Sequence, residues 1–250
     1  MTPCLLALDT STECLAVAVQ GRERHWCSNE AGGALASRHL VPLIEALMAE
    51  AGLVYTDLAA IAFGCGPGAF TGLRTSCAVA QGLALGSDLP LIAIDSLLIV
   101  AEDARAQVQQ AAGPNAPLDV NVAVDARMDE VYGARYRWHA QAWHTLDAPA
   151  LYSLPALVEA WQGSAPDVLA GSASRAFGAR LVLAAARRIE QESDRAAALL
   201  RLAQQGWRTS AALDAALALP LYVRDRVALT TQERTQERER VRQAKLAALP

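Results

Sequence analysis

One sequence pattern occurs twice, near the start of each half of the chain. Residues 5–19 read LLALDTSTECLAVAV, which is an apolar strand ending in Asp9, a short polar turn and an alternating strand. Residues 121–135 read NVAVDARMDEVYGAR and follow the same order, with Asp125 lying 116 residues after Asp9. A coincidental match is the alternative explanation. A true repeat of this unit predicts two lobes of related topology.

Each half also contains segments whose patterns predict further strands and helices. Apolar or alternating runs between turn residues predict strands, and apolar residues at three- and four-residue spacing predict helices. In the first half, the predicted strands are 4–9, 14–19, 22–27, 59–64 and 90–94, and the predicted helices are 34–51, 72–86 and 95–110. In the second half, strands are predicted within 119–138 and at 166–171, with helices near 154–161, 174–190 and 195–205.

Two lobes that each begin with antiparallel strands and continue into β/α units have the layout of actin-like and sugar-kinase folds. We therefore predict the α/β class, with a two-lobed actin-like (ASKHA) fold built from duplicated β/α lobes. The AAGPNAP stretch at 111–117 is a candidate linker. We expect a first lobe at 1–110, a second at 111–228 and a charged tail at 229–250.

Composition excludes several classes of protein. With 53% hydrophobic and 19% charged residues, the chain is typical of a globular protein and not of a disordered one. Its net charge of −4 provides no overall positive field that would attract nucleic acid or anionic lipid. The start of the chain has no basic region like that of a signal peptide, and no apolar run is long enough for a membrane span. We expect a cytoplasmic protein without a membrane segment.

The cysteines support a reducing compartment. There are five, an odd number, and they form no CxxC pair: Cys4, Cys14, Cys27, Cys65 and Cys77. Cys65 beside Gly66 is a conceivable nucleophile, but no feature indicates a base to activate it. We therefore expect neither a disulfide framework nor a structural zinc site.

A glycine-rich loop, AFGCGPGAFTGLR at 62–74, joins a predicted strand to a predicted helix. Such loops often bind phosphates through backbone N–H groups. A Walker loop requires Gly-Lys, which is absent, whereas Gly64 to Ala69 fits the dinucleotide pattern, with Asp95 ending the next strand as a ribose-binding acid. Against a dinucleotide site, Pro67 has no N–H to offer a pyrophosphate. We expect a structural connection that presents the helix 72–86 to a partner, with a dinucleotide-binding oxidoreductase as a weaker alternative.

The turn after the first strand contains the candidate ligand-binding residues. Asp9, Ser11 and Thr12 stand where an actin-like ATPase carries its phosphate and magnesium loop, so the carboxylate could hold metal-bound water and the hydroxyls could bond phosphate. The glycine that lets the backbone approach phosphate is missing, and the same residues are common turn formers. An actin-like nucleotide hydrolase using Asp9, Ser11 and Thr12 is the alternative function, and we assign no cofactor.

Other catalytic patterns are absent or ambiguous. There is no HExxH or GxSxG motif, and the histidines are too scattered to predict a metal site. Asp125, Arg127, Asp129 and Glu130 cluster at the second turn, where a carboxylate pair could do acid–base work. A charged hairpin tip is the other interpretation of that cluster.

Two helices are candidates for a partner interface. The helix 34–51 carries an apolar stripe, and the helix 72–86 is rich in Gly, Ala and Ser, which lets another backbone approach closely. Packing within the chain is the alternative. The predicted contact residues are Leu40, Leu43, Ile44, Leu47, Leu73, Ser76, Cys77, Ala80, Gln81 and Ala84.

The chain closely resembles the bacterial TsaB (YeaZ) family over most of residues 4–228. The stretches that match are LALDTSTECLAVAV, DLAAIAFGCGPGAFTGLRTSCAVAQGLALGSDLPLIAIDSL, VAVDARMDEVYGARY and PLYVRDRVA. Two features depart from the family pattern: Ala36-Ser37 precede Pro42 where relatives often carry a histidine, and the chain continues beyond Ala228.

This resemblance implies the actin-like fold and a part in the synthesis of threonylcarbamoyladenosine on tRNA. It implies a non-catalytic subunit that binds and activates TsaD, the transferase that modifies the adenosine next to the tRNA anticodon. It further implies that TsaE joins the complex, that the chain alone forms a homodimer through the same helices, and that tRNA contact is indirect. A nucleotide would bind only at the boundary between subunits.

Overall fold

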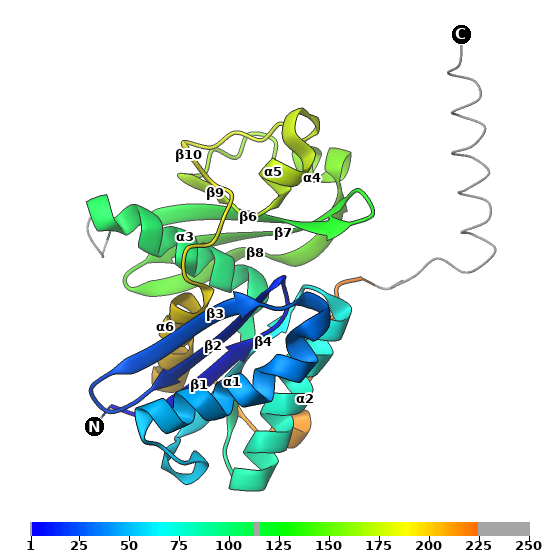
Figure 1. Cartoon of the computed structure of the whole chain (residues 1–250). Coiled ribbons are helices and arrows are strands. Elements are labelled where there is room, and N and C mark those ends of the chain that lie inside the picture. Colours follow the sequence, from blue (N-terminus) through cyan, green and yellow to red (C-terminus); the bar gives the residue numbers. More distant parts are fainter. Residues whose placement is uncertain (1, 113–115, 225–250) are drawn as a thin grey trace, which may run out of the picture.

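The computed structural model describes residues 2–112 and 116–224, which form two lobes, each built around one β-sheet (Figure 1). The first sheet has the order β11-β5-β4-β1-β2-β3 and the second has the order β10-β9-β6-β7-β8. The strands of the first sheet are β1 (Leu5–Asp9), β2 (Cys14–Gln20), β3 (His25–Ala31), β4 (Ala60–Gly66), β5 (Leu91–Asp95) and β11 (Ala212–Leu213). Those of the second are β6 (Leu118–Arg127), β7 (Glu130–His139), β8 (Ala142–Ser153), β9 (Val168–Ala170) and β10 (Arg187–Ile189).

The two sheets share one topology, except that the first has the additional edge strand β11. Strand β1 pairs antiparallel with β2 and parallel with β4, and β6 likewise pairs antiparallel with β7 and parallel with β9. Asp9 and Asp125 occupy equivalent places, near the ends of the central strands β1 and β6. The predicted α/β class and the duplication of β/α lobes are therefore confirmed, and so is the internal repeat.

Helices cover both faces of the first sheet and separate it from the second (Figure 1). α1 and α2 pack against one face, whereas α6, together with part of α3, covers the other. α3 also packs against β6 and β7, so it lies between the two sheets. The helices are α1 (Ala36–Ala51), α2 (Phe70–Ser87), α3 (Ser96–Ala112), α4 (Leu154–Ala160), α5 (Ala173–Phe177) and α6 (Arg195–Arg208), with short 3₁₀ turns η1 (Gly33–Leu35), η2 (Tyr55–Asp57), η3 (Gly178–Arg180) and η4 (Ala215–Leu217). None of the helices in these described ranges is both long enough and apolar enough to cross a bilayer.

Helix α1 forms for the reasons that its sequence pattern indicates. Leu40, Ile44 and Leu47 recur on one side and are buried against the first sheet. The helix ends at Gly52, whose φ of 65° lies in the left-handed region that favours glycine. Gly52 thus marks the end of the helix predicted at 34–51.

The predicted lobe boundaries need a correction. The chain returns to the first lobe after β10, because Leu199 and Leu202 of α6 share a core with Leu5 and Ala7 of β1. Strand β11 then pairs antiparallel with β5 at the edge of the first sheet. The second lobe therefore does not extend to residue 228, and part of the predicted second lobe completes the first. The predicted tail at 229–250 lies outside the described residues.

Two predicted elements also differ from the structure. Strand β3 begins at His25 and not at residue 22, because Gly21 N–H donates to the Arg24 carbonyl at 2.8 Å and closes a turn there. The helix predicted near 174–190 is wrong beyond its first turns. Residues 187–189 form β10, which pairs parallel with β9.

Candidate functional site

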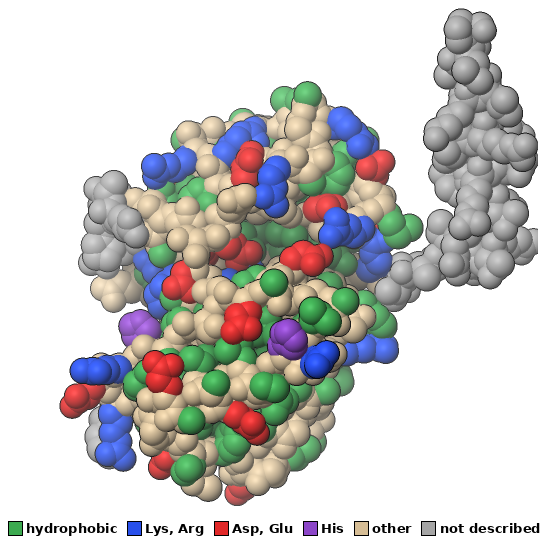
Figure 2. Space-filling view, in the orientation of Figure 1, with side chains coloured by type: hydrophobic (Ala, Val, Ile, Leu, Met, Phe, Trp, Pro, Cys, Tyr) green, Lys and Arg blue, Asp and Glu red, His purple; other side chains and the backbone are tan. Residues whose placement is uncertain are grey.

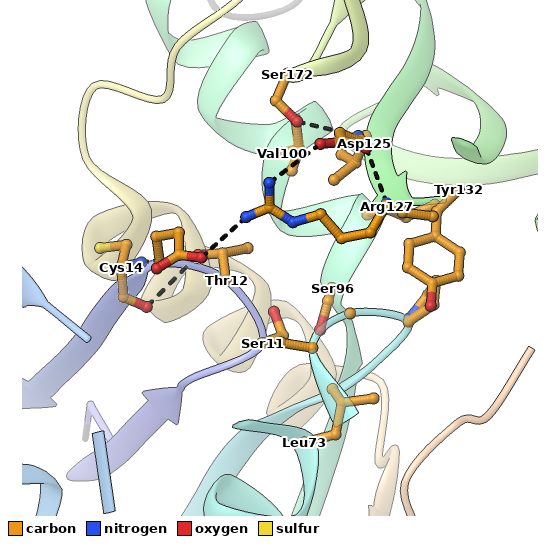
Figure 3. Close-up of a pocket in the computed structure, with 18 of the residues that line it drawn as sticks. Ser11, Thr12, Cys14, Leu73, Ser96, Val100, Asp125, Arg127, Tyr132 and Ser172 are labelled. Atoms are coloured by element: carbon orange, nitrogen blue, oxygen red, sulfur yellow. Dashed lines mark hydrogen bonds and ion pairs between the residues drawn. The ribbon is translucent and has the colours of Figure 1, made fainter. Parts of the chain in front are cut away.

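A cavity of about 770 Å³ lies between the two lobes. Its walls are formed by the turns that follow the central strands, β1–β2 and β6–β7, and by the β4–α2 loop. The first half of α3, part of α5 with the two residues before it, the segment leading into α6 and residues 221–224 complete the walls. Figure 3 shows Ser11 and Ser96 from the first lobe, and Asp125, Arg127 and Tyr132 from the second, arranged around this space.

Asp9 lies beneath the cavity as one half of a buried ion pair. Its side chain is 0% exposed, and its Oδ2 accepts a hydrogen bond from Arg195 Nε at 2.7 Å. The same oxygen accepts the Ser11 hydroxyl at 2.9 Å and the Ser11 N–H at 3.3 Å. A Cβ atom at residue 64 would stand 1.7 Å from Asp9 Oδ1, so only Gly64 leaves room for this carboxylate.

Arg195, the first residue of α6, uses its whole guanidinium inside the protein. Besides Asp9, it donates to Glu192 Oε2 at 2.5 Å, to Ser11 Oγ at 3.0 Å and to the Ser96 carbonyl at 3.4 Å. Burial alone would lower the pKa of Arg195, but the charges of Asp9 and Glu192 outweigh it and raise that pKa. Burial raises the pKa of Glu192 against the opposing effect of Arg195.

The structure thus brings together two of the three predicted ligand residues. Asp9 and Ser11 share a hydrogen-bond network, whereas the Thr12 hydroxyl caps its own turn by accepting the Cys14 N–H at 3.1 Å. Sequence reasoning missed Arg195, which reaches Asp9 across 186 residues. Its position gives no signal, because an arginine at the start of a helix is ordinary. The carboxylate proposed to hold metal-bound water is therefore already neutralised by a side chain of the protein.

The charged cluster at the β6–β7 turn is distributed among separate ion pairs. Arg127 pairs with Glu13 of the first lobe at 3.2 Å and with Asp125 at 3.5 Å. Asp129 and Glu130 pair with other arginines, at 3.1 Å and 2.7 Å. The carboxylates therefore do not form an acid–base pair, and the interpretation as a charged hairpin tip is correct.

The glycine loop packs tightly against the first turn. The Ala69 N–H donates to the Ser11 carbonyl at 2.7 Å, and Thr10 Oγ1 donates to the Gly72 carbonyl at 2.7 Å. A Cβ atom at residue 72 would lie 1.8 Å from the Thr10 carbonyl oxygen, and one at residue 68 would lie 2.5 Å from that of Ser11. These glycines allow close backbone approach within the chain, which agrees with a structural connection.

Asp95, the candidate ribose-binding acid, is used elsewhere. It is not part of the cavity wall, and its carboxylate accepts the Tyr136 hydroxyl at 2.5 Å and the Leu97 N–H at 2.8 Å. Burial raises the pKa of Asp95 although these hydrogen bonds oppose it. Asp95 is therefore not placed to bind a ribose in the cavity, which argues against the dinucleotide-binding alternative.

The cysteine beside the glycine loop is held as a thiol. Burial, followed by the charges of Asp95 and Asp9, raises the pKa of Cys65 to about 12. Within residues 2–112 and 116–224, no group of three or more His, Cys, Asp or Glu side chains is placed to hold a metal ion.

The predicted interface residues require a correction. Eight of the ten are buried inside the first lobe and therefore cannot touch a partner: Leu40, Ile44, Leu47, Leu73, Ser76, Cys77, Ala80 and Ala84. Leu43 is partly buried against the same core, and Gln81 donates to the carbonyls of Ala215 and Ala218 at 3.0 and 3.1 Å. The apolar stripe of these helices faces the sheet, so any partner contact must use their outer faces.

Comparisons with known proteins are consistent with this architecture. A family model described as TsaD, tRNA N6-adenosine threonylcarbamoyltransferase, matches residues 34–178. The chain is 43% identical over 128 residues to the tRNA threonylcarbamoyladenosine biosynthesis protein TsaB of Haemophilus influenzae, covering 51% of each chain. It is 35% identical over 143 residues to the protein of the same name from Escherichia coli, covering 55% of this chain and 59% of that one. These matches span little more than half the length of either relative.

A solved structure matches over a much larger part of the chain. YeaZ from Pseudomonas aeruginosa is 32% identical with a TM-score of 0.77, and the match covers 88% of this chain and 99% of that one. A second structure, titled as an uncharacterized protein with similarity to peptidase YeaZ, is 33% identical with a TM-score of 0.78 and is covered over its whole length. The family model is described as TsaD, but the near-complete match to YeaZ and the two TsaB relatives favour the TsaB description for this chain. The chain belongs to the TsaB (YeaZ) family.

Proposed function

We propose that this chain is a non-catalytic subunit in the synthesis of threonylcarbamoyladenosine on tRNA, and that it binds and activates TsaD. TsaD would transfer the threonylcarbamoyl group to the adenosine next to the anticodon. The relatives from Haemophilus influenzae and Escherichia coli are named for this biosynthesis, which supports the proposal.

The buried pair of Asp9 and Arg195 is the observation that carries the non-catalytic part of this proposal. In a nucleotide hydrolase of this fold, the Asp9 carboxylate would hold metal-bound water. Here Arg195 and Ser11 already bond that carboxylate at 2.7 and 2.9 Å. A metal ion would have to displace a buried cation from Asp9 and leave it with Glu192 as its remaining counter-charge, which is costly. The arrangement supports a binding role over hydrolysis.

The outer faces of α1 and α2 support the partner-binding part. The two helices pack side by side on one face of the first sheet, so their exposed sides form one surface (Figure 1). Ala46, Ala49, Ala78 and Gly82 are exposed there, and small side chains let a helix of another chain approach closely. Leu85 is 64% exposed on the same helix as Gly82 and would be buried by such a contact. Figure 2 shows hydrophobic side chains between isolated charges over α1.

The remaining partners are part of the same proposal. TsaE would join the complex of this chain with TsaD, and the chain alone would form a homodimer through the outer faces of α1 and α2. The net charge of −4 supports a tRNA contact made through TsaD, because tRNA binding relies on an excess of positive side chains. A nucleotide would bind at the boundary between subunits and not to this chain alone.

Substitutions at Gly82 test the proposed surface. Gly82 is exposed within α2, and a Cβ atom there meets nothing within 4 Å, so the fold accommodates a side chain. By light-scattering chromatography with cognate TsaD, we expect a heterodimer for the wild type and for Gly82→Ala, and loss of the heterodimer for Gly82→Arg. Ala184→Arg, on an exposed residue of the second lobe, is the matched charge control and should bind normally.

The possible outcomes separate the alternatives. Normal binding by Gly82→Arg would move the interface away from α2. Failure of the wild-type chain to bind TsaD, with or without ATP and TsaE, would contradict the proposal. Magnesium-dependent ATP turnover by the purified chain, lost in a folded Asp9→Asn variant and retained in Asp119→Asn, would favour the nucleotide hydrolase.

A further inference from the structure

Tyr132 is the buried polar residue of the cavity wall whose side chain is left without a partner. It lies on β7, is 8% exposed, and packs in the core between the sheets with Leu97 and Val100 of α3. Its hydroxyl makes no hydrogen bond to the protein within residues 2–112 and 116–224, and its oxygen is not sealed in the core but opens to the cavity. Figure 3 shows the side chain entering the cavity with its hydroxyl end toward the first lobe. Because the ring is buried while the hydroxyl faces the cavity without a protein partner, this hydroxyl is available to a ligand.

The other buried polar side chains of the cavity wall are occupied. The Ser96 hydroxyl accepts the Gly66 N–H at 3.0 Å, and the Ser11 hydroxyl donates to Asp9 at 2.9 Å and accepts from Arg195 at 3.0 Å. Tyr136, four residues from Tyr132 on the same strand, bonds Asp95. Tyr132 is therefore distinguished by its free hydroxyl and not by its position on the strand.

Apolar side chains form part of the same cavity wall as Tyr132. Leu73 and Leu97 are each 2% exposed, and Val100 and Val124 complete the apolar part of the lining. The volume of about 770 Å³ falls within the range of small-molecule sites, which combine apolar walls with a few placed polar groups. A rigid ring fills such a space with little loss of conformational freedom, and one polar substituent is enough to satisfy Tyr132.

The charges around the cavity cancel. The cavity wall contains no histidine or lysine, and it has as many carboxylates as guanidinium groups. The carboxylates are Glu13, Asp125, Glu190 and Glu192, and the guanidinium groups are Arg127, Arg175, Arg195 and Arg224. Arg195 and Arg127 are held in the ion pairs described above, and Arg224 pairs with Glu130 at 2.7 Å. Arg175 and Glu190 are both exposed and have opposite signs. A lining without net charge gives an anionic ligand no net attraction.

We propose that the interlobe cavity binds an uncharged, ring-bearing small molecule that hydrogen-bonds to Tyr132. The site goes beyond the proposed subunit role, since it uses the cleft and not the outer faces of α1 and α2. Asp9, Ser11 and Arg195 at the base of the cavity are bonded to one another. The phosphates of a nucleotide therefore find no free cation at Asp9. The ligand class follows from the apolar walls, the single free hydroxyl and the balanced charges.

Benzamide and benzoate form a matched pair of probes for this site. They share the ring and the approximate size, but benzamide is neutral and benzoate is an anion. In a protein-detected NMR titration of the full chain, we expect benzamide to shift the Val100 and Val124 methyl resonances in a saturable way. Benzoate should bind at least about fivefold more weakly.

Tyr132→Phe tests the hydrogen bond. Since the hydroxyl has no internal partner, its removal should leave the melting temperature unchanged, and it should weaken benzamide binding by about fivefold, the typical effect of one neutral hydrogen bond. Tyr55→Phe, in η2 of the first lobe and away from the cavity, is the control and should bind as the wild type does. The proposal is overturned if neither probe binds saturably, if benzoate binds as tightly as benzamide, or if Tyr132→Phe has no effect on binding.

Discussion

Arg195 Nε lies 2.7 Å from Asp9 Oδ2 in the buried floor of the cleft, although 186 residues separate the two in the chain. The pair joins the first strand of the first sheet to the first residue of α6. It therefore fixes the end of β1 and the start of α6 at once, where the two lobes meet. The residues that suggest a ligand site in the sequence form a structural cross-link in the folded protein.

Removing the charge of Asp9 should destabilise the fold strongly. Asp9→Asn leaves the buried Arg195 guanidinium with only part of its counter-charge, and breaking a buried pair costs about 3–5 kcal/mol. We expect a loss of this size in the free energy of unfolding measured in urea. The double variant Asp9→Asn/Arg195→Met should lose less than the sum of the two single losses, because the pair is coupled. Strict additivity would show that the two side chains do not depend on each other.

Asp95 is also buried, but removing its charge should cost much less stability than removing that of Asp9. Because burial raises its pKa, the charge of Asp95 is less favoured in the folded protein, and Asp95→Asn should cost less stability at pH 7 than Asp9→Asn does. The stabilising contribution of a group with a raised pKa is complete below its ordinary value of 3.8 and is lost as the pH rises through the folded value. The wild type should therefore gain stability relative to Asp95→Asn between pH 7 and pH 4. A variant as damaged as Asp9→Asn would contradict this assignment.

Glu102 should make the folded protein less stable as the pH falls, which is the reverse of the effect of Asp95. Its carboxylate is buried and accepts hydrogen bonds from Arg105, Arg201 and the Trp143 indole. Burial raises the pKa of Glu102, but the two arginines outweigh it and lower that pKa below its ordinary value of 4.5. Its contribution is complete above pH 4.5 and is lost as the pH falls through the folded value.

Glu102→Gln should therefore cost about 2 kcal/mol at pH 7, in the range for hydrogen bonds to a charged group. Urea unfolding between pH 5 and pH 3 should give a steeper loss of stability for the wild type than for the variant. Parallel pH profiles would show that Glu102 does not cause this part of the acid sensitivity.

Two glycines should respond oppositely to the same substitution. A Cβ at residue 64 would overlap Asp9 Oδ1 at 1.7 Å, so Gly64→Ala should cost at least about 3 kcal/mol or prevent folding. Gly82 is exposed in the interior of α2 with free space around it, so Gly82→Ala should stabilise the chain by about 0.5–1 kcal/mol. Thermal unfolding followed by circular dichroism measures both changes. Equal effects at the two positions would contradict the packing described for Gly64.

The sequence was most informative where local pattern and fold agree. The alternating strand after Asp9, its counterpart after Asp125 and the glycine loop all predict elements that the structure contains. Short-range periodicity reports which side of an element is buried, and turn residues report where it ends. The duplicated topology follows because each lobe repeats the same local order of strands.

The candidate site was predicted less well because its partners are remote. Nothing in the local sequence links Arg195 to Asp9, or β10 to its neighbour β9. The helix stripes were misassigned to a partner for a different reason. An apolar stripe indicates a buried face, but periodicity does not say whether the sheet of the same chain or a second protein covers it. In α1 and α2 the sheet covers it.

The late return of α6 and β11 to the first sheet affects how the chain folds during its synthesis. Strands β1 to β5 leave the ribosome first, but α6 covers one face of their sheet and β11 pairs with the edge of β5. The segment between Ala112 and Arg195 must be translated before that face can be covered. At about 5–20 residues per second, the nascent first lobe keeps apolar surface open for roughly 4–17 seconds. The lobe that begins translation first is thus completed last.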